Sequence, residues 1–150
     1  MLSIAWGATR STVVQFVDTN VLLYSISRDA DESEKARRAN GILSIGDVGL
    51  SVQVLQEFYV QATRASRQDA ITHQQAVGLI DAWRRFPIQE TTVDVMVAAF
   101  RTRQRFGISY WDAAIIEASR FLGCSVVLSE DLDTRTDYDG IRVENPFVDA

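Results

Sequence analysis

Short apolar runs alternate along the chain with longer stretches in which apolar residues recur every three or four positions. The short runs predict strands over residues 12–17, 48–50, 88–90, 124–128 and 141–143. In the longer stretches the spacing is that of a helix face packed on a core, as at Leu55, Phe58 and Ala62. The pattern therefore predicts a chain in which strands and helices alternate.

Residues that favour helix ends stand at the boundaries of these stretches. Ser51, Thr72 and Ser109 suit N-caps, and either Thr92 or Asp94 starts a further helix that Gly107 ends. Alternating strands and helices predict an α/β domain, with a mainly parallel central sheet of four to five strands between layers of helices.

Length and composition set the size of the domain. A chain of 150 residues with 47% apolar residues can bury one core. We expect residues 13–150 to form a single domain, and residues 1–12, which lack clear periodicity, to form an irregular N-terminal leader. No apolar run is long enough to cross a bilayer, so we expect a cytoplasmic protein with no membrane partner. The only cysteine, Cys124, lies in an apolar run, which predicts a buried thiol.

The formal net charge of −5 argues against nucleic-acid binding through bulk positive charge. The basic residues are nearly all arginine, and Lys35 is the only lysine. Arginine suits contacts with phosphate, although exposed arginines are also ordinary surface residues. A local basic rim beside an acidic site is therefore compatible with the composition.

Four carboxylates are predicted to meet at one edge of the sheet. Asp18 and Asp131 follow apolar strands, while Glu57 and Asp112 stand early in helices that begin on the same side. In parallel sheets this edge, beyond the carboxyl ends of the strands, is where ligands bind. Two simpler interpretations remain open. Asp18 could only cap the turn that Thr19 begins, and Glu57 could lie on a solvated helix flank.

Carboxylates that meet in this way repel one another. Two of them about 4 Å apart repel by roughly 4 kcal/mol at an effective dielectric constant of 20, so some must take up protons or share a cation. His73 is the only histidine, and a single cysteine cannot build a thiolate cluster. An all-oxygen ligand set favours Mg²⁺, with Mn²⁺ as a substitute.

Four segments carry a resemblance to a known family. They are FVDTNVL at 16–22, QEF at 56–58, ISYWDAA at 108–114 and VLSED at 127–131. In order and approximate spacing they resemble the acidic motifs of PIN-domain ribonucleases, and those of VapC-type toxins of toxin–antitoxin pairs in particular. The resemblance extends over about residues 13–147.

The resemblance implies a three-layer α/β/α fold and a specific set of site residues. The catalytic and metal-binding quartet would be Asp18, Glu57, Asp112 and Asp131, with Asn20 and Ser129 as polar supports. Glu130, beside Asp131, is a second candidate for the fourth acid.

The resulting prediction is an Mg²⁺-dependent endoribonuclease in which metal-activated water hydrolyses a phosphodiester and leaves a 5′-phosphate and a 3′-hydroxyl. Arg64 and Arg67 are candidate substrate contacts. By resemblance, the partners would be an RNA substrate, a VapB-type antitoxin that places an arginine among the carboxylates, and a second copy of the chain in a homodimer.

Three other classes compete with this prediction. A receiver-like phosphoacceptor domain would need a lysine at a late strand end, but Lys35 stands in an early helix. A phosphatase of the haloacid dehalogenase type would need an aspartate where Asn20 stands. The third is a non-catalytic PIN-like module that binds nucleic acid or protein and keeps the acids for structure.

Overall fold

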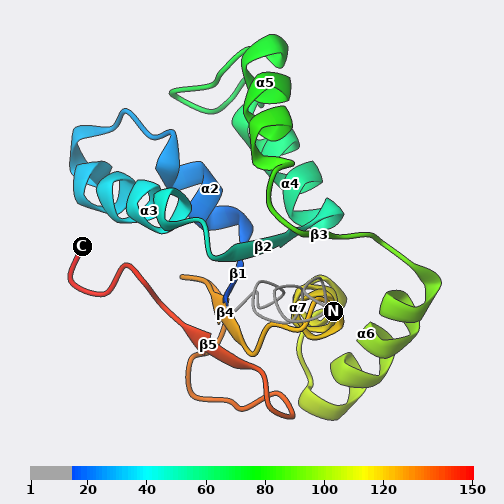
Figure 1. The fold of residues 1–150 in the computed structure, drawn as a ribbon. Coiled ribbons are helices and arrows are strands. Elements are labelled where there is room, and N and C mark those ends of the chain that lie inside the picture. Colours follow the sequence, from blue (N-terminus) through cyan, green and yellow to red (C-terminus); the bar gives the residue numbers. More distant parts are fainter. Residues whose placement is uncertain (1–14) are drawn as a thin grey trace, which may run out of the picture.

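Five short parallel strands form the centre of the computed structural model, which describes residues 15–150 (Figure 1). They are β1 (Gln15–Val17), β2 (Val48–Ser51), β3 (Ile88–Gln89), β4 (Val126–Leu128) and β5 (Arg142–Glu144), in the order β3-β2-β1-β4-β5. Phe16 in the middle strand pairs with Gly49 on one side and Val127 on the other. Because both flanks of β1 are paired, the residue that follows it is held at the centre of the sheet edge.

Helices cover both faces of this sheet (Figure 1). One layer contains α2 (Thr19–Ser25), α3 (Ser33–Ile45), α4 (Val52–Ala62) and α5 (His73–Trp83). The other contains α6 (Val93–Phe106) and α7 (Tyr110–Phe121). Crossovers between parallel strands are right-handed, so the direction in which the chain crosses decides which face of the sheet the connecting helix covers. Here both faces are covered, which confirms the predicted three-layer α/β/α fold. Helix α7 contacts β2, β3 and β4, and every residue from 113 to 119 in it is buried.

The predicted helix starts are confirmed by their caps. The side chains of Ser51, Thr72, Thr92 and Ser109 each accept a hydrogen bond from the backbone N–H three residues further on. Thr92, rather than Asp94, is therefore the N-cap of α6. Gly107 ends α6 with a φ of 67°, a left-handed conformation that costs glycine little.

The structure departs from the sequence prediction immediately after β1. The prediction places a turn at Thr19 and Asn20, but both residues belong to the first turn of helix α2. Val21 and Leu22 of this helix are fully buried. A helix of seven residues is too short for its periodicity to stand out beside a buried strand.

Four strands have boundaries that differ from the prediction. β2 ends one residue later than predicted, at Ser51, and β3 ends one residue earlier, at Gln89. The apolar run at 124–128 forms a strand only from Val126, because the N–H of Cys124 donates to the carbonyl of Ser119 in the turn that follows α7. The last strand lies one residue later than predicted, over Arg142–Glu144. The Cys124 thiol is buried as expected, and burial raises its pKa to about 11.

Two expectations concern the ends and surface of the chain. The predicted leader at residues 1–12, and the first residues of the predicted first strand, lie outside the described residues. Between residues 15 and 150, no helix combines the length and the apolarity needed to cross a bilayer.

Candidate active site

Asp18 leaves the end of β1 and is the N-cap of α2. Its Oδ1 accepts the N–H of Thr19 at 2.8 Å, and its Oδ2 accepts the hydroxyl of Ser129 at 2.7 Å. Burial raises the pKa of Asp18 to about 6, partly opposed by these two hydrogen bonds and reinforced by the negative charges of Glu57 and Asp131. Asp18 therefore caps α2 and also lies close enough to Glu57 and Asp131 to be affected by their charges.

A hydrogen-bond network joins the loop after β4 to Asp18 and to the first turn of α2. The Ser129 hydroxyl, which donates to Asp18, also accepts the N–H of Asp131 at 3.0 Å. The amide of Asn20 donates to Asp131 Oδ2 at 3.3 Å, and its oxygen accepts the N–H of Glu130 at 3.2 Å. The two predicted polar supports therefore hold the groups at both strand ends. Ser129 binds the Asp18 carboxylate and the Asp131 N–H, and Asn20 binds the Asp131 carboxylate and the Glu130 N–H.

Glu57 and Asp112 reach the same region from opposite layers of the fold. Glu57 is half-buried in the middle of α4, later in its helix than predicted. Asp112 is half-buried in the first turn of α7, as predicted, and its N–H donates to the side chain of Ser109. Gln53 joins the two helices, because its amide donates to Glu57 Oε1 at 2.8 Å and to the carbonyl of Trp111 at 3.2 Å. One carboxylate oxygen of Glu57 is thereby oriented by a neighbour on its own helix.

These side chains line one cleft of about 310 Å³. All four predicted acids border it, together with residues that include Thr19 and Tyr24 of α2, Gln61 of α4 and Arg67 of the segment between α4 and α5. Within the described part of the chain, none of the four acids forms an ion pair with lysine or arginine. Nowhere in residues 15–150 do three or more Asp, Glu, His or Cys side chains lie close enough together to hold one metal ion. The acids thus share a cleft without forming a tight cluster.

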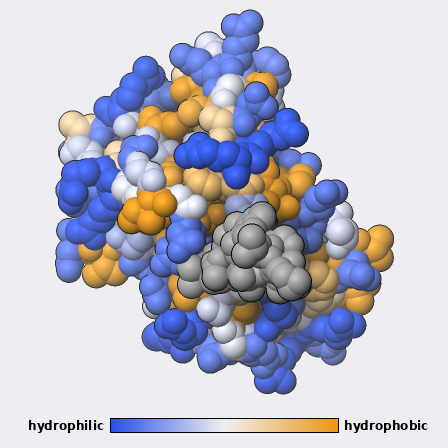
Figure 2. All heavy atoms as spheres, in the orientation of Figure 1, coloured by the Kyte–Doolittle hydropathy of each residue, from blue (hydrophilic) through white to orange (hydrophobic). Residues whose placement is uncertain are grey.

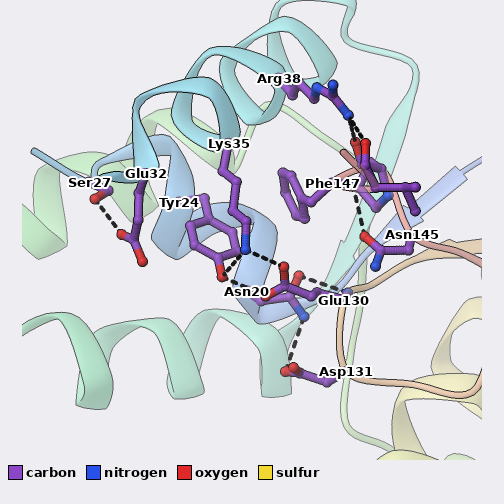
Figure 3. Close-up of polar contacts among 12 residues, drawn as sticks. Asn20, Tyr24, Ser27, Glu32, Lys35, Arg38, Glu130, Asp131, Asn145 and Phe147 are labelled. Atoms are coloured by element: carbon purple, nitrogen blue, oxygen red, sulfur yellow. Dashed lines mark hydrogen bonds and ion pairs between the residues drawn. The ribbon is translucent and has the colours of Figure 1, made fainter. Parts of the chain in front are cut away.

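Glu130 and Asp131, the two candidates for the fourth acid, have different surroundings (Figure 3). Glu130 accepts the hydroxyl of Tyr24 at 2.5 Å and the ammonium of Lys35 at 2.6 Å. Although burial acts to raise it, these two donors hold the pKa of Glu130 below its usual value. Asp131 is exposed, and the side-chain donor to its carboxylate is Asn20. Glu130 is therefore already neutralised, whereas Asp131 remains available to a ligand.

The two candidate substrate arginines occupy different places. Arg67 lines the acidic cleft and forms an ion pair with Asp69 at 3.0 Å. Arg64 is exposed and lines a neighbouring pocket that shares Glu57 with the cleft.

Three supporting residues were not indicated by the sequence pattern. Gln53 stands four residues before Glu57 on one helix, a spacing that brings side chains together and could have identified it. Tyr24 and Lys35 meet Glu130 from 106 and 95 residues away, and nothing local signals those contacts.

The fold and the cleft together define a class of protein, a three-layer α/β/α domain with acids from four elements at the carboxyl edge of a parallel sheet. The sequence model of the PIN domain matches residues 15–137, and the chain belongs to the PIN-domain family. No similar protein was found among curated proteins.

Solved structures share the fold. A toxin–antitoxin complex from Klebsiella pneumoniae is 20% identical with a TM-score of 0.64, covering 89% of this chain and 98% of that chain. DNA-bound VapBC from Salmonella typhimurium is 16% identical with a TM-score of 0.63 and the same coverage. VapC20 of Mycobacterium tuberculosis, a Sarcin-Ricin loop cleaving toxin, is 22% identical with a TM-score of 0.61, covering 83% of this chain and 92% of that chain.

Proposed function

We propose that this protein is a divalent-cation-dependent endoribonuclease of the VapC type, the toxin of a toxin–antitoxin pair. The observation that carries the proposal is the cleft in which Asp18, Glu57, Asp112 and Asp131 meet from four different elements without ion-pair partners among the described residues. Membership of the PIN-domain family supports it, as do structural relatives described as toxins.

The donor chemistry of the cleft fits Mg²⁺ or Mn²⁺. Its described lining offers carboxylate oxygens and contains neither histidine nor cysteine. Mg²⁺ keeps several of its waters and commonly binds one or two carboxylates directly, so a tight group of three acids is not required. Asp18, Glu57, Asp112 and Asp131 would hold the ion between them, directly or through water.

Each group in the cleft would then have a distinct task. A divalent ion held by these carboxylates would polarise the phosphate and promote attack by water at phosphorus. Asn20 and Ser129 keep Asp131 and Asp18 oriented, and Gln53 keeps Glu57 oriented. Arg67 at the rim would contact a phosphate of the substrate. Attack by water would leave a 5′-phosphate and a 3′-hydroxyl and would not use the ribose 2′-hydroxyl.

Two protein partners accompany this function. A VapB-type antitoxin would neutralise the toxin by placing a guanidinium among the carboxylates, where its charge replaces that of the cation. A second copy of the chain would bind through exposed apolar surface. Helix α6 carries such a surface at Val93, Met96, Val97 and Phe100, which recur at helical spacing and are 37–70% exposed. Figure 2 shows apolar atoms at the edge of the molecule in the region of α6.

Cleavage of total cellular RNA tests the proposal. Purified protein is incubated with Mg²⁺, with Mn²⁺ or with EDTA, and the product ends are mapped. We expect cleavage only with a divalent ion, 5′-phosphate ends, and a loss of at least about 100-fold in rate for Asp18→Asn. The matched control is Asp47→Asn, an exposed carboxylate just before β2, at the opposite edge of the sheet.

The same experiment addresses the non-catalytic alternative. A PIN-like binding module would show no divalent-dependent cleavage, and Asp18→Asn would not differ from Asp47→Asn. Equal RNA cleavage by both variants would also contradict the proposal, because the activity would then come from a contaminant or from another site.

A further inference from the structure

A second pocket opens beside the acidic cleft, between α4 and the start of α7, with a volume of about 420 Å³. The two cavities share four lining residues, which are Gln53, Glu57, Gln61 and Trp111. A ligand that extends from the acidic cleft across these shared residues would reach this pocket. Its volume lies in the range of small-molecule binding sites.

The pocket has an aromatic wall that is exposed and held in place. Trp111 is 65% exposed, although large aromatic side chains are usually well buried. Its ring packs edge-on against Tyr110, with centroids 4.9 Å apart, and its carbonyl accepts the amide of Gln53. Val60, which is 54% exposed, contributes a second apolar surface from α4. The Trp111 ring is therefore exposed, while its backbone and one edge are held by neighbours, so a flat ligand could stack on it.

The other lining residues add polar groups to this largely apolar pocket, and two of them are charged, Glu57 and Arg64. Gln56 and Gln61 supply amide donors and acceptors, whereas the amide nitrogen of Gln53 already donates to Glu57 and to the carbonyl of Trp111. Arg64 is exposed and forms no ion pair within residues 15–150. Proteins that bind single-stranded RNA combine these groups, stacking a base on an aromatic ring, pairing its edge with amides and holding its phosphate with arginine.

We propose that this pocket binds one base of single-stranded RNA, stacked on Trp111 and followed by a phosphate at Arg64, next to the phosphodiester in the acidic cleft. The inference rests on the proposed function, which places the scissile phosphate in that cleft. It makes Trp111 and Arg64 substrate-binding residues and favours an unpaired nucleotide beside the cleavage position.

The composition of the pocket favours a base over a second copy of the chain. The exposed apolar stripe of α6 contributes no residue to the pocket, so the surface suited to self-association is separate. An aromatic ring with the amides of Gln56 and Gln61 beside it matches the stacking and edge contacts of a base, and the pocket is far smaller than the surface that a stable protein–protein contact buries.

RNA binding by a cleavage-deficient variant tests the inference. In the Asp18→Asn background with Mg²⁺, the affinity for a 12-nucleotide single-stranded RNA of mixed sequence is measured by fluorescence anisotropy. We expect Trp111→Ala to weaken binding about tenfold and Trp111→Phe to retain it within about threefold, because phenylalanine also stacks. Phe121→Ala is the matched control, since Phe121 is 46% exposed at the opposite end of the same helix. A 12-base-pair RNA duplex is expected to compete poorly.

Kinetics in the otherwise wild-type protein provide a second readout. Trp111→Ala is expected to raise KM more than it lowers kcat, because the stacked base contributes to ground-state binding. If the wild type cleaves RNA and Trp111→Ala binds and cleaves with unchanged constants, the base site is refuted while the nuclease function stands. If the wild type does not cleave, Trp111-dependent RNA binding would support the base site although the proposed function fails.

Two further outcomes overturn the inference. Absence of both cleavage and binding contradicts the base site and the nuclease function together. If Trp111→Ala converts a dimer to a monomer in size-exclusion chromatography with light scattering and leaves RNA affinity unchanged, the pocket is an interface between copies. Thermal melting of each variant shows that the exposed substitution has not unfolded the protein.

Discussion

The ammonium of Lys35 lies 2.6 Å from Oε2 of Glu130, so the only lysine of the chain neutralises the acid next to Asp131. The same ammonium lies 3.2 Å from the Tyr24 hydroxyl, which itself donates to Glu130 (Figure 3). This arrangement leaves Asp131 as the acid of the pair that has no ion-pair partner within residues 15–150. Because Lys35 compensates the charge of Glu130, a phosphate that approaches the cleft meets one less unpaired negative charge.

Lys35→Met is expected to weaken RNA binding more than stability. The ion pair is partly exposed, at 24% and 26% of the two side chains, and such pairs contribute no more than about 1 kcal/mol to the free energy of unfolding. An uncompensated Glu130 would repel the substrate and raise KM severalfold. Adding Glu130→Gln removes that charge and should restore KM. Steady-state kinetics and urea denaturation measure both effects, and a KM equally high in the double variant would contradict this explanation.

Asp18→Asn is expected to stabilise the metal-free protein at neutral pH. Burial raises the pKa of Asp18 from 3.8 to about 6, so the folded protein holds this proton more tightly than the unfolded chain. Its contribution to stability is therefore full below about pH 4 and is lost as the pH rises toward 6. The loss approaches about 3 kcal/mol at pH 7.

Urea denaturation in EDTA at pH 4 and pH 7.5 checks this sign. Because other carboxylates, such as Glu130, have lowered pKa values and change stability in the opposite direction, the informative quantity is the difference between variant and wild type. That difference should favour Asp18→Asn at pH 7.5 and shrink at pH 4. Asp47→Asn should show no such trend, and a pH-independent difference would argue against a raised pKa for Asp18.

Ser129→Ala is expected to lower the free energy of unfolding by about 1–3 kcal/mol and to reduce cleavage. The Ser129 hydroxyl is fully buried, donates to Asp18, and accepts the backbone N–H groups of Asp131 and Leu132. Alanine would leave these groups unpaired away from water, which costs about that much. Ser44→Ala, on the exposed side of α3, is the control and should change stability by less than about 0.5 kcal/mol. A Ser129→Ala protein as stable and active as the wild type would exclude a role for this hydroxyl.

Thermal melting tests the divalent ion independently of RNA cleavage. A ligand that binds only the folded state raises the melting temperature, so Mg²⁺ should stabilise the wild type relative to NaCl of equal ionic strength. Asp112→Asn removes one acid from the cleft and should respond much less to Mg²⁺. Equal shifts for the two proteins would show that Asp112 does not contribute to ion binding.

The order of strands and helices and most helix starts could be predicted from the sequence because their causes are local. Ser51, Thr72 and Ser109 cap helices through hydrogen bonds that span three residues, and apolar spacing indicates which face is buried. The placement of Asp18 and Asp131 at one sheet edge also follows from a parallel sheet, in which all strands end on the same side. Helix α2 was not predicted, since burial by the surrounding layers, rather than its own short periodicity, stabilises it.

The sequence by itself therefore determined most of the elements and which acids share an edge, because chain direction and side-chain spacing are enough for that. Only the tertiary structure decided how those acids differ. Ser129 reaches Asp18 across 111 residues, and Lys35 reaches Glu130 across 95. Such partners are chosen by the packing of whole layers, and it is packing that buries one carboxylate, neutralises a second and leaves a third exposed.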